Sequence, residues 1–380
     1  MAFIRKLIWL LLANVPLWLN AQDSLSFRGQ LSGFLNYSNG SDLPLAAGAR
    51  FIPQANYGIA LPSEHLLDFE FSASLGGHLL MDPFDRHNMA GTLKPYRAWT
   101  RYSGKQFEVR AGLQKINFGS ATMLRPLMWF DLLDPRDPLQ LTDGVYGLMG
   151  RYYTLTNANL WFWILYGNQG QRAWQATETS RGVPEIGGRL QLPVGMGEVA
   201  ATFHHRNAEA LVAAVSSTAN PNQIQENRIG FDGKWDLGVG VWFETTWLGR
   251  REPQLLHSHQ HLLTVGADYT FSLGNGLTMM AEHLEMAVGP NPFSFDVSAR
   301  FTAFSTSYPV ALNHHLTAIV YRDWNGKNQY HFLNWRIQFS RLQLFCMAFW
   351  NPHDAILPQQ GAGGQMFAGR GAQLMLVYNY

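Results

Sequence analysis

Apolar and polar residues alternate one by one along much of this chain, so that each alternating stretch would carry one apolar and one polar face as a β-strand. Near the beginning, for example, Leu25, Phe27 and Leu31 share one parity, while Arg28 and Gln30 share the other. This period of two is that of strands and not of helices. The alternation is strongest at 25–37, 67–75, 107–113, 229–237, 263–271 and 333–339.

Weaker stretches of the same kind fill the intervals, and the whole set predicts about 18 strands, an even number as in single-chain bacterial barrels. If 48–60 and 94–102 belonged to one folded loop, the count would fall to about 16, which is also even and therefore equally acceptable. The weaker candidates lie at 48–60, 94–102, 145–154, 158–166, 184–192, 198–205, 239–247, 277–287, 296–306, 311–322, 342–350 and 372–380.

The connections between these stretches alternate in length, which is a second and independent signal. Short turns on one side and long loops on the other are typical of outer-membrane barrels. The short connections lie at 103–105, 155–157, 193–197, 273–276, 307–309 and 340–341. The longer connections lie at 38–47, 80–93, 119–143, 167–183, 206–227, 248–262, 288–295 and 351–371.

The composition agrees with strands that face lipid on one side. The chain is 13% aromatic and only 14% charged, whereas ordinary soluble domains are about 25% charged. Because apolar residues are spread one in two, no later stretch reaches the roughly 18 consecutive apolar residues of a spanning helix. The lone Cys346 excludes an intrachain disulfide. We therefore expect an all-β fold, a transmembrane antiparallel up-and-down β-barrel, because a soluble β-sandwich would not explain the loop rhythm.

Both ends of the chain point to export. Residues 1–21 have a positive start at Arg5 and Lys6, a short apolar core and a small residue, Ala21, at the expected cleavage point, as in a secretory signal peptide. The last strand ends on Tyr380 and resembles the C-terminal signal that the barrel-assembly machinery reads in bacterial outer-membrane proteins. We expect one barrel domain over 22–380, in the outer membrane, with the lipid bilayer and lipopolysaccharide as partners.

The segment 119–143 is too apolar and aromatic for a loop that lies free in water. The alternation stops after Gln114, which indicates a β-bulge or the end of a strand. We expect this loop to fold into the barrel and narrow the pore, although a loop packed on its neighbours as an outer cap is the alternative. The charged residues it would bring there are Arg125, Asp131, Asp134, Arg136 and Asp137.

The residues 109–119, VRAGLQKINFG, followed by DLLDP at 131–135, resemble the R-x-G-x-Q-x-I-x-x-G and D-x-x-x-P stretch of alginate-export-type and related porin-like barrels. The resemblance implies a monomeric barrel that conducts a solute through an arginine-rich lumen, with Arg110, Gln114 and Asp131 as the matching positions. The chain departs from the family pattern at Leu113, where a polar residue is usual. The substrate therefore does not carry over.

These observations favour a porin-like channel for small polar or charged solutes. A non-conducting barrel that serves as a subunit of a larger outer-membrane assembly is the alternative, and a barrel enzyme comes third, because no nucleophile and base can be paired. The residues whose parity predicts an inward side chain also include Arg300 and Arg336, with Glu244 and Glu282 as opposite charges. The candidate pore-lining and constriction residues are Arg97, Arg101, Glu108, Arg110, Gln114, Arg125, Asp131, Asp134, Arg136, Asp137 and Arg151.

Other chemistry finds little support in the sequence. His257, His259 and His261 fall on one side of an extended segment and are weak candidates for a transition-metal site. The aspartates of the loop 119–143 could offer oxygens to Ca²⁺, but the prolines after Asp134 and Asp137 indicate turns first. We therefore expect no cofactor, no catalytic residues and no nucleic-acid partner.

Overall fold

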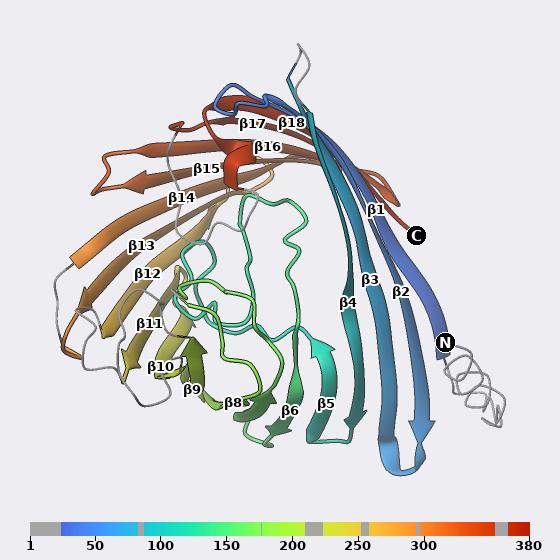
Figure 1. Ribbon diagram of the computed structural model, residues 1–380, viewed down its shortest axis with the longest axis vertical. Coiled ribbons are helices and arrows are strands. Elements are labelled where there is room, and N and C mark those ends of the chain that lie inside the picture. Colours follow the sequence, from blue (N-terminus) through green and yellow to red (C-terminus); the bar gives the residue numbers. More distant parts are fainter. Residues whose placement is uncertain are drawn as a thin grey trace.

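The computed structural model of the chain describes residues 24–82, 87–175, 177–209, 223–251, 258–293, 297–353 and 364–380. The expected signal peptide at 1–21 lies outside these residues. The strands form one antiparallel sheet that closes on itself (Figure 1). They are β1 (Ser24–Ser38), β2 (Leu45–Leu61), β3 (His65–Met81), β4 (His87–Ser103), β5 (Phe107–Gln114), β6 (Val145–Tyr153), β7 (Asn159–Leu165), β8 (Glu185–Val194), β9 (Gly197–Glu209), β10 (Gln223–Asp236), β11 (Gly240–Arg250), β12 (His259–Phe271), β13 (Leu277–Gly289), β14 (Val297–Ala311), β15 (His314–Asp323), β16 (Gln329–Gln338), β17 (Leu342–Trp350) and β18 (Arg370–Asn379).

Each strand pairs with its neighbours in sequence, and β1 pairs with both β2 and β18. The predicted antiparallel up-and-down barrel of 18 strands is thus confirmed. The alternative of fewer strands is wrong, because 48–60 and 94–102 belong to β2 and β4. Two short 3₁₀ helices complete the structure, η1 (Pro62–Glu64) and η2 (Gly364–Phe367).

The outer face of the barrel is apolar and the inner face is mixed. On β18, Leu374, Leu376 and Tyr378 are exposed, whereas Met375 and Val377 between them are buried. The same alternation on β7 exposes Phe162 and buries Trp163. Because the strand period is two, the exposed apolar belt faces lipid and the other parity faces the lumen. Among the described residues, no helix is long and apolar enough to cross a membrane.

The prediction that Arg300 faces the lumen is wrong. Phe301 and Ala303 are buried against the lumen, so Arg300 faces outward, where its Nε lies 3.2 Å from Oε1 of Glu285. The inward parity of β14 was mispredicted because Phe301 and Phe304 fall on opposite parities of this strand. Apolar character alone does not show which parity points inward.

The barrel closes where the end of the chain meets β1. Gly29 and Tyr380 exchange both backbone hydrogen bonds, with N to O distances of 3.2 and 3.1 Å. The Tyr380 ring covers the space where a side chain at Gly29 would stand. The ring also stacks on Phe51 of β2, at 6.4 Å between centroids. Because Gly29 has no side chain, the Tyr380 ring can lie across the seam, the junction between β1 and β18.

Replacing Gly29 with valine is expected to displace the Tyr380 ring and to weaken this closure by about 1 kcal/mol, the low end of the cost of overpacking, because Tyr380 is 44% exposed and its ring can move aside. The folded barrel should then lose its compact mobility on SDS gels at a lower temperature than the wild type. Gly33→Val is the matched control on the same strand, because a Cβ there would meet only the Gly48 carbonyl oxygen, 3.8 Å away. Equal transition temperatures for the two variants would contradict this account of the seam.

Candidate functional site: the loop inside the barrel

The strand β5 ends at Gln114, as the break in alternation predicts, and the chain then enters the lumen (Figure 1). The Gln114 side chain is fully buried and donates from Nε2 to the carbonyl oxygen of Gly147 on β6, at 3.0 Å. Residues 115–144 connect β5 to β6 and contact strands on the far side of the ring. We call this connection the lumen loop.

Glu282 of β13 holds the middle of the lumen loop. Its carboxylate accepts hydrogen bonds from the backbone N–H groups of Thr122, Met123 and Leu124, at 2.6, 2.9 and 2.6 Å. Nε1 of Trp242 on β11 donates a fourth bond at 2.9 Å. A carboxylate with several N–H donors satisfies backbone groups that the lumen loop cannot pair internally.

A second wall carboxylate holds the same part of the lumen loop. Glu244 of β11 accepts from the backbone N–H of Ala121 at 2.9 Å and from that of Leu127. Thr264 of β12 donates its hydroxyl to the carbonyl oxygen of Leu124 at 2.7 Å. Inner parity correctly placed Glu244 and Glu282 in the lumen, but only the structure shows that they bind the loop backbone.

A buried ion pair shapes the lumen loop from within. Nη1 of Arg125 lies 3.3 Å from Oδ2 of Asp131, and Asn117 donates to the same oxygen at 2.7 Å. Nη2 of Arg125 also donates to the Phe118 carbonyl oxygen at 3.0 Å, and Trp174 donates to the carbonyl oxygen of Arg125 at 2.8 Å. Arg125 and Asp131 therefore stabilise the loop conformation and leave little free charge for a solute.

Aromatic residues of the lumen loop pack on the wall formed by β6 to β9. Phe118 stacks on Trp163 of β7 at 5.7 Å between ring centroids, and Phe130 meets His204 of β9 edge-on at 4.9 Å. Trp129 contacts both Phe118 and Phe130 and is almost fully buried. These rings cluster against one wall, and they anchor the loop by apolar burial.

The tip of the lumen loop, residues 132–143, is arranged differently. Arg136 pairs with Asp134, with Nε 2.7 Å from Oδ1, and its guanidinium lies over the rings of Phe332 and Phe367 at 5.3 and 5.6 Å. Asp137 accepts from the backbone N–H groups of two later loop residues. Burial raises the pKa of the Asp137 carboxyl, while those N–H groups and the charge of Arg50 act in the opposite direction.

Between this tip and the inner wall of β14 to β17 lies a cavity of about 280 Å³. Loop residues Arg136 and Asp137 line one side of it. The opposite side carries apolar and polar wall residues, namely Ser307, His315, Thr317, Ile319, Phe332, Asn334, Arg336, Phe345 and Met347. The cavity is part of the lumen, because these parities point inward.

The predicted arginines of β4 to β6 gather around one carboxylate on the other side of the lumen. Arg101, Arg110 and Arg151 lie 3.4, 3.8 and 3.2 Å from Glu108. Their side chains are 29%, 15% and 19% exposed, so they keep a face toward the lumen. Arg97 is buried and donates to the Thr142 carbonyl oxygen at 2.9 Å, which ties the loop tip to β4.

The structure offers no support for a metal centre. No group of three or more His, Cys, Asp or Glu residues suited to a metal ion occurs among the described residues. His257 lies outside them, and His261 stacks on Trp247 at 4.6 Å between centroids. The oxygens of Asp131, Asp134 and Asp137 serve separate interactions in the lumen loop, so they form no shared Ca²⁺ site.

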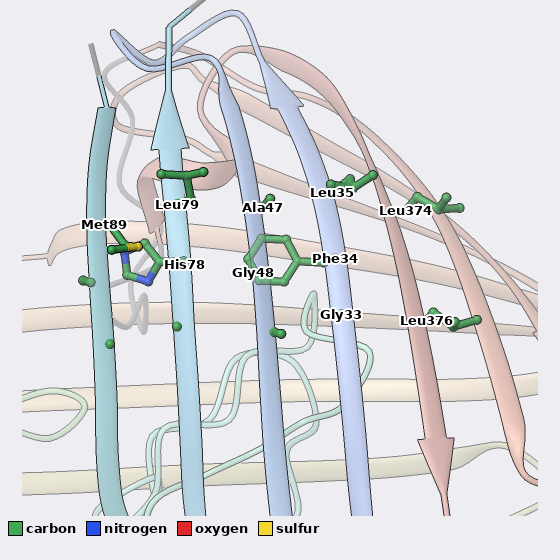
Figure 2. Close-up of a pocket in the computed structure, with 14 residues that line it drawn as sticks. Gly33, Phe34, Leu35, Ala47, Gly48, His78, Leu79, Met89, Leu374 and Leu376 are labelled. Carbon is green, nitrogen blue, oxygen red and sulfur yellow. The ribbon is translucent and has the colours of Figure 1, made fainter. Parts of the chain in front are cut away.

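A larger hollow, of about 720 Å³, lies on the outside of the barrel and not in the lumen. Figure 2 shows its walls, formed by Leu35, Leu374 and Leu376 on one side and by Leu79 and Met89 on the other. Its lining holds no charged side chain. Because the outer face meets lipid, this groove is unsuited to a polar solute.

No protein-family model matches the chain, and no curated protein matches its sequence. Among solved structures, OccK5 (OpdH) of Pseudomonas aeruginosa is similar over 94% of this chain and 97% of its own, with a TM-score of 0.58 and 11% identity. The fold is that of bacterial outer-membrane porins.

Two further structures agree with this porin fold. OccAB1 of Acinetobacter baumannii matches 95% of this chain and 97% of its own, with a TM-score of 0.56 and 8% identity. An anion-selective porin from Comamonas acidovorans matches 94% of this chain and 100% of its own, with a TM-score of 0.50 and 11% identity. The predicted porin-like barrel is confirmed, while such low identities say nothing of the solute.

Proposed function

We propose that this protein is an outer-membrane channel for small polar or charged solutes, which pass through the lumen beside the tip of the lumen loop. The observation that carries the proposal is the cavity between Asp137 on the tip and Arg336 on the wall. A closed barrel with an apolar outer face needs a membrane, and its polar lumen is the only polar route through that membrane. We assign no catalytic role and no cofactor to the described residues.

The proposal includes the path of the protein to the membrane. The residues 1–21 would be removed as a signal peptide, and the strand that ends at Tyr380 would be read by the barrel-assembly machinery. Lipid and lipopolysaccharide would then cover the outer apolar belt. Arg101, Arg110 and Arg151 would line the route below the loop, where their partly exposed guanidinium groups attract anions.

A second candidate is a non-conducting barrel that serves as a subunit of a larger assembly. The observation that favours it is the apolar packing of the lumen loop: Met123 and Leu124 pack against Phe301 and Phe332 and fill part of the lumen. The two candidates differ in whether an open path remains beside the tip.

Single-channel recording in a planar bilayer distinguishes them. We expect the purified full-length barrel to conduct KCl, and we expect a variant that lacks residues 134–140 to conduct more, because the deletion removes the tip that bounds the cavity. The anchors at Glu244 and Glu282 remain in that variant. If neither protein conducts, although both show the heat-dependent gel mobility of a folded barrel, the channel proposal fails and the subunit is favoured.

A further inference from the structure

The cavity beside the loop tip is lined by two charged side chains, Arg336 and Asp137, that form no ion pair with another described residue. Arg336 projects into it from β16, near the strand end that leads to the short turn at 339–341. Its guanidinium forms no hydrogen bond or ion pair with another described residue. This distinguishes Arg336 from Arg101, Arg136 and Arg189, each of which lies within 3.0 Å of a carboxylate oxygen.

Other polar side chains, Asn334 and His315, lie next to Arg336 on the wall of the cavity. Oδ1 of Asn334, at the next inward position of β16, is buried and has no hydrogen-bond partner. His315 lies directly across on β15, where its Nε2 is 2.8 Å from the Ser307 hydroxyl. A second hollow of about 340 Å³ shares Arg336 and His315 with the first and is also lined by residues 312–314 and 338–339, at the end of the barrel with short turns. Oδ1 of Asn334 thus adds an acceptor without a partner to the wall of the cavity, beside the guanidinium of Arg336.

The negative charge lies on the loop side. The Asp137 carboxylate accepts from the N–H groups of Leu139 and Leu141, at 3.0 and 3.4 Å, and forms no ion pair with a described residue. The nearby Asp134 and Arg136 neutralise each other, with Nε 2.7 Å from Oδ1. Asp137 is therefore the carboxylate of this side that forms no ion pair with a described residue, and the charge of Arg50 acts on it from further away.

Apolar residues line the same cavity as the two charged side chains. Phe332, Phe345 and Met347 line the same cavity and are almost fully buried, and Ile319 adds an aliphatic side chain from β15. A solute with an apolar side chain would find apolar neighbours there, in a site that is already largely shielded from water.

We propose that this cavity is a binding subsite for a zwitterionic solute with an apolar side chain, such as a free amino acid or a short peptide. The solute carboxylate pairs with Arg336, its ammonium group faces Asp137, and its side chain lies on Phe332 and Phe345. Guanidinium and carboxylate form strong, directional hydrogen bonds, so Arg336 fixes the orientation of the solute. This inference rests on the proposed channel function for its biological meaning, but the binding itself does not require conduction.

Calorimetric titration of the full-length barrel in detergent tests the subsite with four probes of nearly equal shape. These are L-leucine, the anion 4-methylpentanoate, the cation 3-methylbutylamine and the neutral 4-methylpentanamide. We expect leucine to bind at least about tenfold more tightly than each of the others, since a factor of ten corresponds to about 1.4 kcal/mol. Arg336→Gln and Asp137→Asn should each weaken leucine binding by about tenfold.

The variants also have distinct signatures. Asp137→Asn should lower the affinity for leucine to that for 4-methylpentanoate. Arg336→Gln should lower the affinities for both leucine and 4-methylpentanoate. Arg341→Gln, in the exposed turn after β16, is the matched control and should leave all four affinities unchanged. Heat-dependent gel mobility verifies that each variant is folded.

Three outcomes would overturn the subsite: no binding of any probe, equal binding of leucine and 4-methylpentanoate, or no effect of Asp137→Asn. Recording KCl conductance from the same preparations separates the two proposals. Conductance without leucine binding rejects the subsite alone, and leucine binding without conductance rejects the channel alone.

Discussion

Glu226→Ala is expected to destabilise the barrel by about 3–5 kcal/mol, the cost of leaving a buried charge without its partner. Glu226 is fully buried on β10, and its carboxylate lies 2.6 Å from Nε of Arg206 and 3.0 Å from Nε of Arg250. Arg228, two residues further along the strand, donates from Nε at 2.9 Å. Removing this one carboxylate would leave three guanidinium groups in mutual repulsion.

The free energy of unfolding, from urea titration of barrels refolded in lipid vesicles, measures this loss. Glu226→Gln should fall between the wild type and the alanine variant, because an amide oxygen still accepts hydrogen bonds but carries no charge. Glu64→Ala is the control: Glu64 pairs with Lys105 at 3.4 Å in an exposed turn, where such pairs contribute about 0–1 kcal/mol. A loss for Glu226→Ala no larger than for Glu64→Ala would show that the arginine cluster does not depend on Glu226.

Glu282→Ala is expected to release the lumen loop from β13 and to increase single-channel conductance. The substitution removes the acceptor for the backbone N–H groups of Thr122, Met123 and Leu124. Each buried N–H left without an acceptor costs about 1–3 kcal/mol, so the docked loop loses most of its advantage over an undocked one. Trypsin should then cut after Arg136, which is buried in the wild type.

Glu285→Ala is the matched control for this variant. Glu285 stands three residues further along β13 on the outward face, where it pairs with Arg300 at 3.2 Å. It should leave both conductance and proteolysis unchanged. If Glu282→Ala shows the same conductance and the same cleavage as the wild type, the prediction fails. Glu244 and the apolar contacts of Met123 and Leu124 would then hold the loop without Glu282.

The candidate site was accessible from sequence only in part. The apolar character of 119–143 predicts a buried loop, and parity predicts that Glu244 and Glu282 face the lumen. The pairing of these carboxylates with loop backbone follows from neither signal, because backbone N–H groups carry no side-chain identity that a sequence could show. The same limit applies to Arg125 and Asp131, which were expected at a constriction and instead stabilise the loop.

By itself, the sequence determined the fold class and the outer face of most strands, because a period of two and the lipid requirement of one parity are local properties of each strand. The structure decided between 18 and about 16 strands and the inward parity of β14. Only the tertiary structure decided which charges remain unpaired in the lumen. Arg336 and Arg101 look alike in sequence, yet Arg101 lies beside Asp68 and Arg336 faces a cavity. That difference depends on which residues barrel closure and the lumen loop bring together from distant parts of the chain.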